Sequence, residues 1–470
     1  MQLSSCFKRK FKELIIELSN TLKIFIHNKD VFLKNKERDR LIFTSINAPL
    51  DLAENENFTI KQLHHSSVSL LYLKELALMA NKELKIKCLS SELNSVIEET
   101  AFLYINSDFE NFSTLYFNDR FKFEINLKLL ILHFKERVLI LESTFTKEIY
   151  HFPVTVFNLN DEIELSKSIR LVPKLTNLDM HDTNMFKSTR SLDINYYLEV
   201  EIAEKCSYQL SSSLAKRARD ASFNILKLMA TTLSPNAIPL VASHEKNIHL
   251  FDFFLHGTNR KEMSKSVVHK FHSYQFESKD FWIEFIKTKQ CNDNIVDISF
   301  SIPELLTIPY LSDKPRVIDR LERALIWYGD AAREENYQFQ IQKVVSSIET
   351  LINYKEDNLT EIFKRRVTIL NKSNDVGNIS HDIFLRADAL YKARSKIIHG
   401  TSINEKLNFC ILELSSYTIL RTIRCFSNFG IEKTGFNKQL PRYIDSLFDY
   451  MNCDYLQPKE KEKITPDLCN

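Results

Sequence analysis

The stretch VIDRLERALIWYGDAAREEN, residues 317–336, sets the architecture that we expect for the last third of the chain. Its apolar side chains recur every three or four positions, as they do on the buried face of a helix: Val317, Leu321, Ala324, Leu325 and Tyr328. Ser312 or Asp313 can cap this helix, and Pro315 suits its first turn. The stretch therefore predicts an amphipathic helix with one face in a core.

Four further helices are expected downstream. The second carries an unbroken apolar stripe of Ile341, Val344, Val345, Ile348, Leu351 and Ile352. The other three are expected within NLTEIFKRRVTIL (358–370), SHDIFLRADALYKARSKIIHG (380–400) and NEKLNFCILELSSYTILRTIRCFSNFG (404–430). Because the connections between these amphipathic segments are short, residues 312–430 are expected to form an up-and-down helical bundle, followed by an extension and tail over 431–470.

The first 305 residues are expected to be rich in β-strands. In RFKFEINLKLLI (120–131) apolar and polar side chains alternate, and IYHFPVTVF (149–157) and LDINYYLEVEI (192–202) repeat this period of two. Several such strands joined by Asn- and Asp-rich turns indicate an antiparallel sheet. The fold class expected for the whole chain is therefore α+β, with a β-rich N-terminal region ahead of an all-α bundle.

Helical spacing at 7–26 indicates an amphipathic helix or an entry to the first sheet, and helical spacing returns at 212–233. The pattern of 247–305 gives no secure assignment. The segment SIPELLTIPYLSDKP (301–315) holds three prolines and is interpreted as a boundary. We expect residues 1–305 to form one region, with a division into two subdomains near 205.

Composition limits the classes of protein that this chain can belong to. Sixty-three basic and 61 acidic residues give a net charge of +2, which argues against a tail-type nucleic-acid binder but allows a local basic surface. The eight cysteines are scattered, with no C-x-x-C pair, and reduced thiols are expected. No apolar run is long enough to span a bilayer, so we expect a soluble, cytoplasmic protein with no membrane partner.

Metal and nucleotide chemistry find little support in the sequence. The pairs at His64 and His65 and at His269 and His272 lack further ligands at workable spacing, so no metal site and no cofactor are expected. Phosphate-binding glycine loops are absent from a chain with six glycines. The basic segments KRAR (216–219) and KRR (364–366) could contact an RNA backbone, but a solvated helix face is the favoured interpretation.

The segment LYKARSKIIHG (390–400) has two interpretations. In the structural one, Arg394 and His399 are cations near the end of a helix that stops at Gly400, where they interact well with the helix dipole. In the functional one they cleave RNA. An imidazole titrates near neutral pH and can move the proton of a 2′-hydroxyl that attacks the adjacent phosphorus, while a guanidinium stabilises the charge that develops there.

This chemistry makes two further predictions. Because DNA lacks the 2′-hydroxyl, the site would act on RNA only, and it would need no metal. One histidine is poorly placed to serve as acid and base on both sides of one phosphorus. A second copy of the site from a partner chain would supply the missing group, which predicts a homodimer with a composite site.

The bundle resembles the HEPN superfamily, and within it the Apea-like HEPN branch of bacterial anti-phage abortive-infection proteins. The resemblance covers about a quarter of the chain and rests on three segments in order: RLERALIWYGDAAREEN, SSIETLI and LYKARSKIIHG. The last matches the superfamily signature of an arginine and a histidine separated by four to six residues. The order of the three segments is more specific than the two-residue signature by itself.

The resemblance implies a metal-independent endoribonuclease that acts as a toxin-like effector and cleaves RNA, tRNA included, during phage infection. Carried over to this sequence, Arg394 would bind the scissile phosphate and His399 would transfer protons. Ser395 stands where the superfamily often has Asn, Asp or His. Glu349 of SSIETLI could orient Arg394, or could be a solvated or capping residue; the sequence leaves both open.

Two basic residues beside the signature, Lys392 and Lys396, are candidates for contacts with the RNA. The N-terminal region would restrain the bundle or recognise a phage-derived trigger. The alternative function is a non-catalytic HEPN module, in which the bundle serves dimerisation or partner binding and the N-terminal region recognises the partner.

Overall fold

The computed structural model describes residues 3–27, 41–42, 63, 65–107, 125–156, 159–173, 196–233, 252–259, 262–268, 275–276, 281–291, 294–312, 314–354, 359–371, 377–401 and 406–447. Within these ranges the fold is mostly helical with one antiparallel sheet of moderate size, a mixed α+β architecture. The chain divides into two compact units. The first comprises 1–147, 204–213 and 309–312, and the second comprises the rest.

The first unit is helical, which corrects the expectation that the whole N-terminal region is β-rich. Its helices are α1 (Ser5–His27), α3 (Ser67–Leu84), α4 (Ser90–Ser107) and α6 (Leu127–Ser143). The strands described in this unit are the two-residue pair β1 (Leu41–Ile42) and β2 (His65–Ser66). The helix predicted at 7–26 is confirmed, and it buries Phe7 and Phe11 against Phe134 of α6.

The strand predicted at 120–131 is wrong from residue 127 onward, and 120–124 lie outside the described residues. Leu130, Ile131, Phe134 and Val138 are buried at helical spacing on α6, and the side chain of Asn126 caps the helix by accepting a hydrogen bond from the Leu129 N–H. A short apolar run can satisfy both periods at once, and here the helical period extends further along the chain.

The second unit contains the sheet and the helical bundle. Its strands are β3 (Ile149–Val156), β4 (Ile163–Ser166), β5 (Ile169–Pro173), β6 (Tyr196–Glu201), β7 (Asp252–Asn259), β8 (Glu262–Val268) and β9 (Gln275–Phe276). They are ordered β4-β5-β6-β3-β7-β8, with β9 paired in parallel to β3. The strands predicted at 149–157 and 192–202 are confirmed as β3 and β6, which pair antiparallel with Phe152 opposite Leu198.

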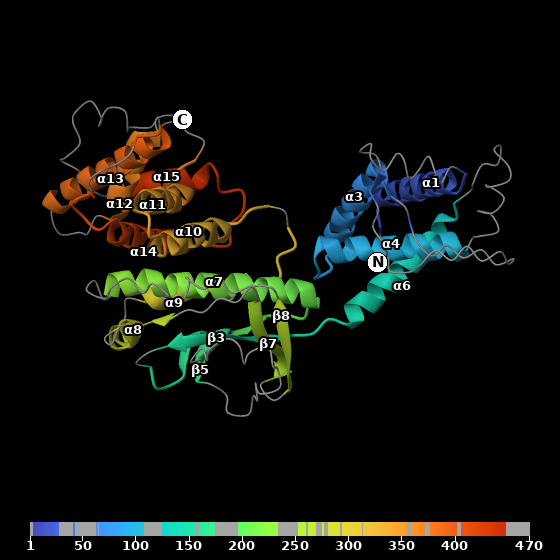
Figure 1. Ribbon diagram of the computed structural model, residues 1–470, viewed down its shortest axis with the longest axis horizontal. Helices are drawn as coiled ribbons and strands as arrows, with labels where there is room; N and C mark the ends of the chain where they lie inside the picture. Colours follow the sequence, from blue (N-terminus) through green and yellow to red (C-terminus); the bar gives the residue numbers. More distant parts are fainter. Residues whose placement is uncertain are drawn as a thin grey trace. The chain divides into compact units, whose positions relative to one another are not determined.

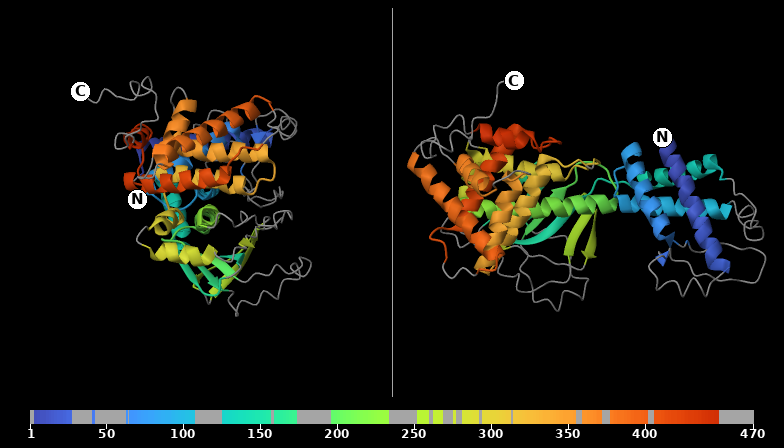
Figure 2. Two further views of the ribbon diagram at one scale, coloured as in Figure 1. Left: turned by 90° about the vertical axis from the view of Figure 1, so that its left-hand side faces the viewer. Right: turned by 90° about the horizontal axis from the view of Figure 1, so that it is seen from above.

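Helices α7 (Tyr208–Leu233), α8 (Phe281–Gln290) and α9 (Ile295–Leu306) accompany the sheet. α7 confirms the helix predicted at 212–233. The segment 301–315, interpreted as a boundary, begins inside α9, which includes Pro303. In Figure 1 and in the left view of Figure 2, α7 (green) lies between the strands and the helices of the bundle (orange).

The five predicted bundle helices are all present, with shifted ends. They are α10 (Val317–Ala332), α11 (Tyr337–Ile352), α12 (Leu359–Asn371), α13 (Gly377–Ile398) and α14 (Ile411–Phe429), and a short sixth helix, α15 (Gln439–Ser446), follows. The predicted cap of the first is wrong. α10 starts after Arg316, whose backbone N–H donates to Asp319 (2.7 Å).

α7 joins the sheet to the bundle. On one side the guanidinium of Arg219 lies 4.9 Å from the ring centre of Phe152 in β3, and on the other Thr231 and Tyr328 of α10 share a hydrogen bond of 2.9 Å. At Gly329 an added Cβ would lie 2.0 Å from Oδ1 of Asn224. The close approach of α7 and α10 therefore requires glycine at this position.

Candidate active site

Helix α13 ends as the sequence predicts. Gly400 adopts φ +81°, a left-handed conformation that glycine adopts without strain. The N–H of Gly400 donates to the carbonyl of Ile397 (3.1 Å), and the N–H of Thr401 donates to that of Lys396 (2.9 Å). These two bonds form a Schellman motif, in which His399 is the last residue before the turn. His399 is exposed, so its imidazole is accessible to a ligand.

Arg394 lies one and a half turns earlier, at the contact between α13 and α11. Its Nη2 donates to Oε2 of Glu349 on α11 (3.3 Å), and the other carboxylate oxygen accepts a hydrogen bond from Nδ2 of Asn353 (3.3 Å). The structure thus brings Glu349 and Arg394 together. The bond is long for a charge-assisted pair and uses one of the five N–H donors of the guanidinium. Arg394 is 28% exposed, so donors remain for a ligand.

Arg394 and His399 do not meet within one chain. Five residues correspond to a rotation of about 140° round a helix of 3.6 residues per turn, so the two side chains leave α13 in different directions. Among the described residues the structure has no hydrogen bond between them. A phosphate held by both groups of one α13 would have to lie beyond the end of the helix, where the imidazole is.

The supporting residues differ in availability. The half-buried Ser395 accepts the His399 N–H through its carbonyl (3.1 Å), which belongs to the helix end rather than to a site. Lys392 is exposed, but its Nζ lies 2.6 Å from Oδ2 of Asp388. Lys396 is exposed and has no ion pair with another described residue. Of the two lysines predicted to bind RNA, Lys396 is the one free to do so.

Tyr391 belongs to this cluster and was not predicted. Its ring centre lies 5.8 Å from the Arg394 guanidinium, and the ring packs on Phe363 at 4.8 Å. Burial, and then the negative charge of Glu349, raise the pKa of Tyr391, so the phenol stays neutral and cannot compete with Glu349 for the arginine's charge. The sequence feature that could have identified Tyr391 is its position three residues before Arg394 on one helix.

Most side chains of the two basic segments are buried or paired with carboxylates. In KRAR, Arg217 donates to both carboxylate oxygens of Glu322 (2.7 and 2.5 Å), and Arg219 is buried. In KRR, Lys364 and Arg366 are buried. The favoured interpretation, a solvated helix face, is therefore wrong for the buried side chains. The partner of Arg217 comes from a helix distant in sequence, whereas Arg219 pairs with the adjacent Asp220 and Lys364 with Glu361.

The side chains that the sequence raised as metal ligands, and the cysteines, lie as follows. No group of three His, Cys, Asp or Glu side chains there could hold a metal ion. His65 is buried beside Glu98 (3.2 Å), whereas His64, His269 and His272 lie outside the described residues. Of the cysteines described, all are free thiols. No helix within the described ranges is long and apolar enough to cross a membrane.

Comparison with protein-family models, with curated proteins and with solved structures finds no match to this chain.

Proposed function

We propose that the protein is a metal-independent endoribonuclease of the HEPN type, with Arg394 and His399 as its catalytic residues. The observation that carries the proposal is the state of these two side chains at the end of α13. Arg394 is oriented by Glu349 yet keeps free donors, and His399 is exposed at a rigid helix end. Neither side chain is committed to several short bonds within the protein, unlike Arg217 of KRAR and Arg366 of KRR.

In the proposed reaction the 2′-hydroxyl of one nucleotide attacks the adjacent phosphorus. The P–O2′ bond forms and the P–O5′ bond breaks, a base takes the 2′-proton, and an acid gives a proton to the leaving 5′-oxygen. Arg394 would donate hydrogen bonds to the non-bridging oxygens as their charge grows. The products are a 2′,3′-cyclic phosphate and a free 5′-hydroxyl, and no step uses a metal or a cofactor.

The proposal includes a homodimer, because the two groups diverge on one helix and because one imidazole cannot stand on both sides of the phosphorus. A two-fold axis near the end of α13 would place the Arg394 and His399 of two chains around one phosphate. Ile398, next to His399, is a large apolar side chain left exposed in the single chain, and a second copy would cover it.

In the wider proposal the enzyme is an effector of anti-phage defence, and the N-terminal region controls it in response to a phage-derived trigger. This part rests on the resemblance of the bundle segments to the Apea-like HEPN branch. The alternative is a non-catalytic HEPN module that binds a partner or dimerises, and the experiment on cleavage distinguishes the two.

The test uses four alanine variants that α13 itself provides. His399→Ala and Arg394→Ala are compared with His381→Ala and Arg386→Ala, an exposed histidine and a half-exposed arginine five residues apart in the first half of the same helix. Purified protein is incubated with total RNA in a chelator, and RNA ends are mapped by sequencing. We expect His399→Ala and Arg394→Ala to lower the cleavage rate by about a hundredfold or more, and the two control variants to stay within about twofold of wild type.

Cleavage that survives His399→Ala in a folded protein, or that the chelator abolishes, would sink the enzyme proposal in favour of the binding module or a metallonuclease. The dimer has its own test. If each site needs both histidines, mixing wild type with an equal amount of His399→Ala and allowing subunits to exchange should leave about a quarter of the activity, since only wild-type pairs are active. Half of the activity would mean that each chain acts alone.

A further inference from the structure

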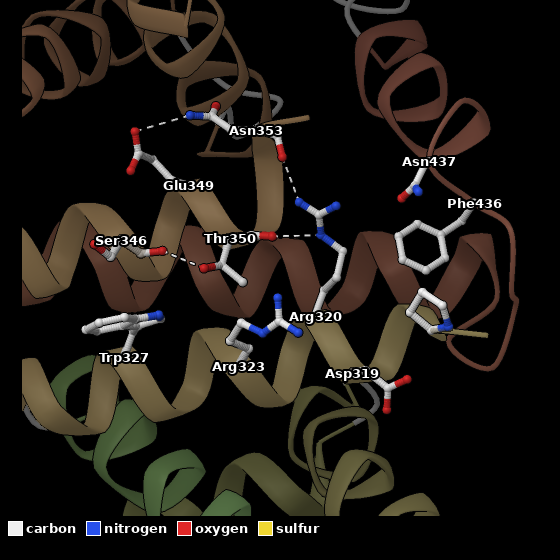
Figure 3. Close-up of a pocket in the computed structure, with 11 residues that line it drawn as sticks. Asp319, Arg320, Arg323, Trp327, Ser346, Glu349, Thr350, Asn353, Phe436 and Asn437 are labelled. Carbon is white, nitrogen blue, oxygen red and sulfur yellow. Dashed lines mark hydrogen bonds between the residues drawn. The ribbon is translucent and has the colours of Figure 1, made fainter. Parts of the chain in front are cut away.

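A cavity of about 520 Å³ opens on the bundle surface between α10 and α11 (Figure 3). From α10 it is lined by Arg320, Arg323 and Trp327, which recur at three- and four-residue spacing on one helix face. Glu349 lines it from α11, and Phe436, in the segment before α15, closes one end. Glu349 also accepts a hydrogen bond from Arg394, so one residue belongs to both the cavity and the candidate active site.

The positive charges in this cavity have no carboxylate partner among the described residues. Nε of Arg320 donates to the carbonyl of Thr350 and Nη2 to that of Asn353, each at 2.7 Å, so its charge is hydrogen-bonded but not neutralised. Arg323 is exposed and has no hydrogen bond or ion pair to another described residue. Two like charges three residues apart on one helix repel each other, and an anion between them would relieve that repulsion.

The two carboxylates that line the cavity are already engaged. Asp319 accepts the backbone N–H of Arg316 (2.7 Å) and lies 3.6 Å from Nη2 of Arg217. Glu349 is shared between Asn353 and Arg394. The electrostatics of the cavity are consequently set by the two arginines. Burial lowers the pKa of Arg320, and repulsion from Arg323 and Arg366 acts in the same direction, although the nearby Tyr354 opposes it.

Aromatic rings lie at both ends of the arginine pair, as Figure 3 shows. Trp327 is 39% exposed, an unusual state for the largest apolar side chain, and its indole offers a flat surface for stacking. At the other end the Arg320 guanidinium lies 5.9 Å from the ring centre of Phe436 and 4.1 Å from that of Tyr354. Arg320 is therefore held by rings and carbonyls, whereas Arg323 and Trp327 are exposed to solvent.

We propose that this cavity holds one nucleotide of an RNA strand, with its phosphate on Arg320 and Arg323 and its base on Trp327. A guanidinium pair matches the oxygens of a phosphodiester, and base stacking on an exposed indole is the usual complement in single-strand binding. The inference rests on the proposed function in one respect: Glu349 connects the cavity to Arg394, so the nucleotide held here would flank the phosphate that is cut. It adds three binding residues outside the signature at 394–399.

Binding is measured separately from cleavage. In the His399→Ala background, a short single-stranded RNA with a terminal fluorophore is titrated by anisotropy, and tryptophan fluorescence is followed in parallel. The chain has two tryptophans, and the other, Trp282, is 2% exposed, so quenching by a stacked base reports on Trp327. We expect Arg323→Ala to weaken binding by about tenfold and to reduce the slope of log K against log salt by about 0.7. Trp327→Ala should weaken binding by at least about fivefold and abolish the quenching.

Arg421→Ala is the matched control, because Arg421 is an exposed arginine of α14 that does not line the cavity. Its affinity should stay within about twofold of the parent. Equal loss in Arg421→Ala and Arg323→Ala would overturn the proposal, since the effect would then be one of net charge. A second titration, with a mononucleotide, distinguishes a cavity that binds an RNA strand from one that binds a free nucleotide. The RNA strand should compete with 5′-AMP for Arg323-dependent quenching, and a cavity that takes 5′-AMP while RNA fails to displace it would overturn the strand proposal.

The two proposals fail separately. If the protein with His399 intact cleaves RNA and Arg323→Ala changes neither its KM nor its RNA affinity, the cavity inference fails and the ribonuclease stands. If no RNA is cleaved but binding depends on Arg323 and Trp327, the cavity is a nucleotide site and the ribonuclease proposal fails. Success of both predicts that Arg323→Ala raises KM by about the same factor as Kd, with kcat changed less.

Discussion

Arg366 and Arg394 lie on neighbouring helices of one bundle, but their guanidinium groups differ in burial and in hydrogen bonding. Arg366 on α12 is 1% exposed; it donates to both carboxylate oxygens of Asp445 (2.9 and 2.7 Å) and to the carbonyl of Ile352 (2.6 Å). Arg394 on α13 is 28% exposed and has one bond of 3.3 Å. The first ties α15 and the end of α11 to α12, so its donors are committed to the fold.

This difference separates a structural arginine from a candidate catalytic one more sharply than sequence spacing does. Removing a partner of a buried guanidinium that makes several short hydrogen bonds lowers the protein's free energy of unfolding, because a charge is left without compensation. A half-exposed one with a single long bond can exchange that bond for a phosphate at small cost. Four predictions test how far this contrast holds, each with the change in the free energy of unfolding as its measure.

The largest effect is expected at Arg366. Arg366→Ala leaves the Ile352 carbonyl without its partner and Asp445 with Arg365 alone, and we expect a loss of about 3 kcal/mol in the free energy of unfolding. Arg394→Ala should cost about 1 kcal/mol or less. Urea denaturation followed by circular dichroism measures both, with the half-exposed Arg386→Ala as the reference for removing an arginine from α13. Equal losses at 366 and 394 would erase the contrast and make Arg394 a structural residue.

A smaller loss is expected at Gly400, the residue that ends α13 beside His399. An added Cβ would meet nothing within 4 Å, so the cost of Gly400→Ala is that of a left-handed backbone, about 1–2 kcal/mol. Asparagine tolerates that conformation better, and Gly400→Asn should lose clearly less stability than Gly400→Ala.

Cleavage should follow the same order at position 400, because His399 is held by the turn. Gly400→Ala should lower the rate more than Gly400→Asn when both proteins are assayed well below their melting temperatures. If the two variants cleave alike while differing in stability, the helix end does not position His399.

The third prediction concerns the bond between Glu349 and Arg394. A double-mutant cycle with Glu349→Gln and Arg394→Gln should give a coupling energy of about 0.5–1 kcal/mol, since both side chains are partly buried. The more exposed pair Asp382 and Arg386 is the internal reference, with an expected coupling of about 0.3–0.5 kcal/mol. Glu349→Gln should also lower the cleavage rate with Arg394 intact, as a positioning residue would. A coupling near zero with unchanged cleavage would assign Glu349 to the cavity alone.

How much of the fold and of the candidate site could be predicted depends on how far along the chain each sequence pattern extends. The stripe from Ile341 to Ile352 extends over about three turns, and α11 appears where that stripe predicts it. The end of α13 was predictable because Gly400 and the preceding cations are local signals. In 120–131 the alternation covered only a few residues, and the helical stripe of α6 continues beyond it to Val138. The alternation at 149–157 and 192–202 is equally short and does mark strands, so its length by itself does not separate the two outcomes.

Partners distant in sequence account for the other errors. Arg217 was interpreted as part of a solvated face because Glu322, its partner, lies more than a hundred residues away. The cavity is a further case. Arg320 and Trp327 lie on one helix face, but Phe436 approaches them because the N–H groups of Val317 and Ile318 bond the carbonyls of Lys433 and Ile431. Nothing in a single sequence reports that contact.

The smallest effect is expected at Asp388, which lies between the two regions of the comparison. Its carboxylate is 3.3 Å from the Nζ of Lys364 on α12 and 2.6 Å from that of Lys392 on α13. Burial alone would raise the pKa of Asp388, but the two lysines outweigh it and hold that pKa below the ordinary value of 3.8. The folded state therefore keeps this carboxylate ionised to lower pH than the unfolded state does.

A depressed pKa stabilises the folded protein fully above the unfolded value, and the stabilisation is lost as the pH falls through the folded value. Wild type should thus lose stability between about pH 5 and pH 2 more steeply than Asp388→Asn, which has no proton to take up there. Because the carboxylate keeps some contact with solvent, which screens the two ion pairs, the difference should not exceed about 0.5 kcal/mol. Asp382→Asn on the same helix is the control for removing an exposed carboxylate. If Asp388→Asn also tightens RNA binding while Asp382→Asn does not, Lys392 is released from its ion pair and becomes, with Lys396, a contact for the RNA.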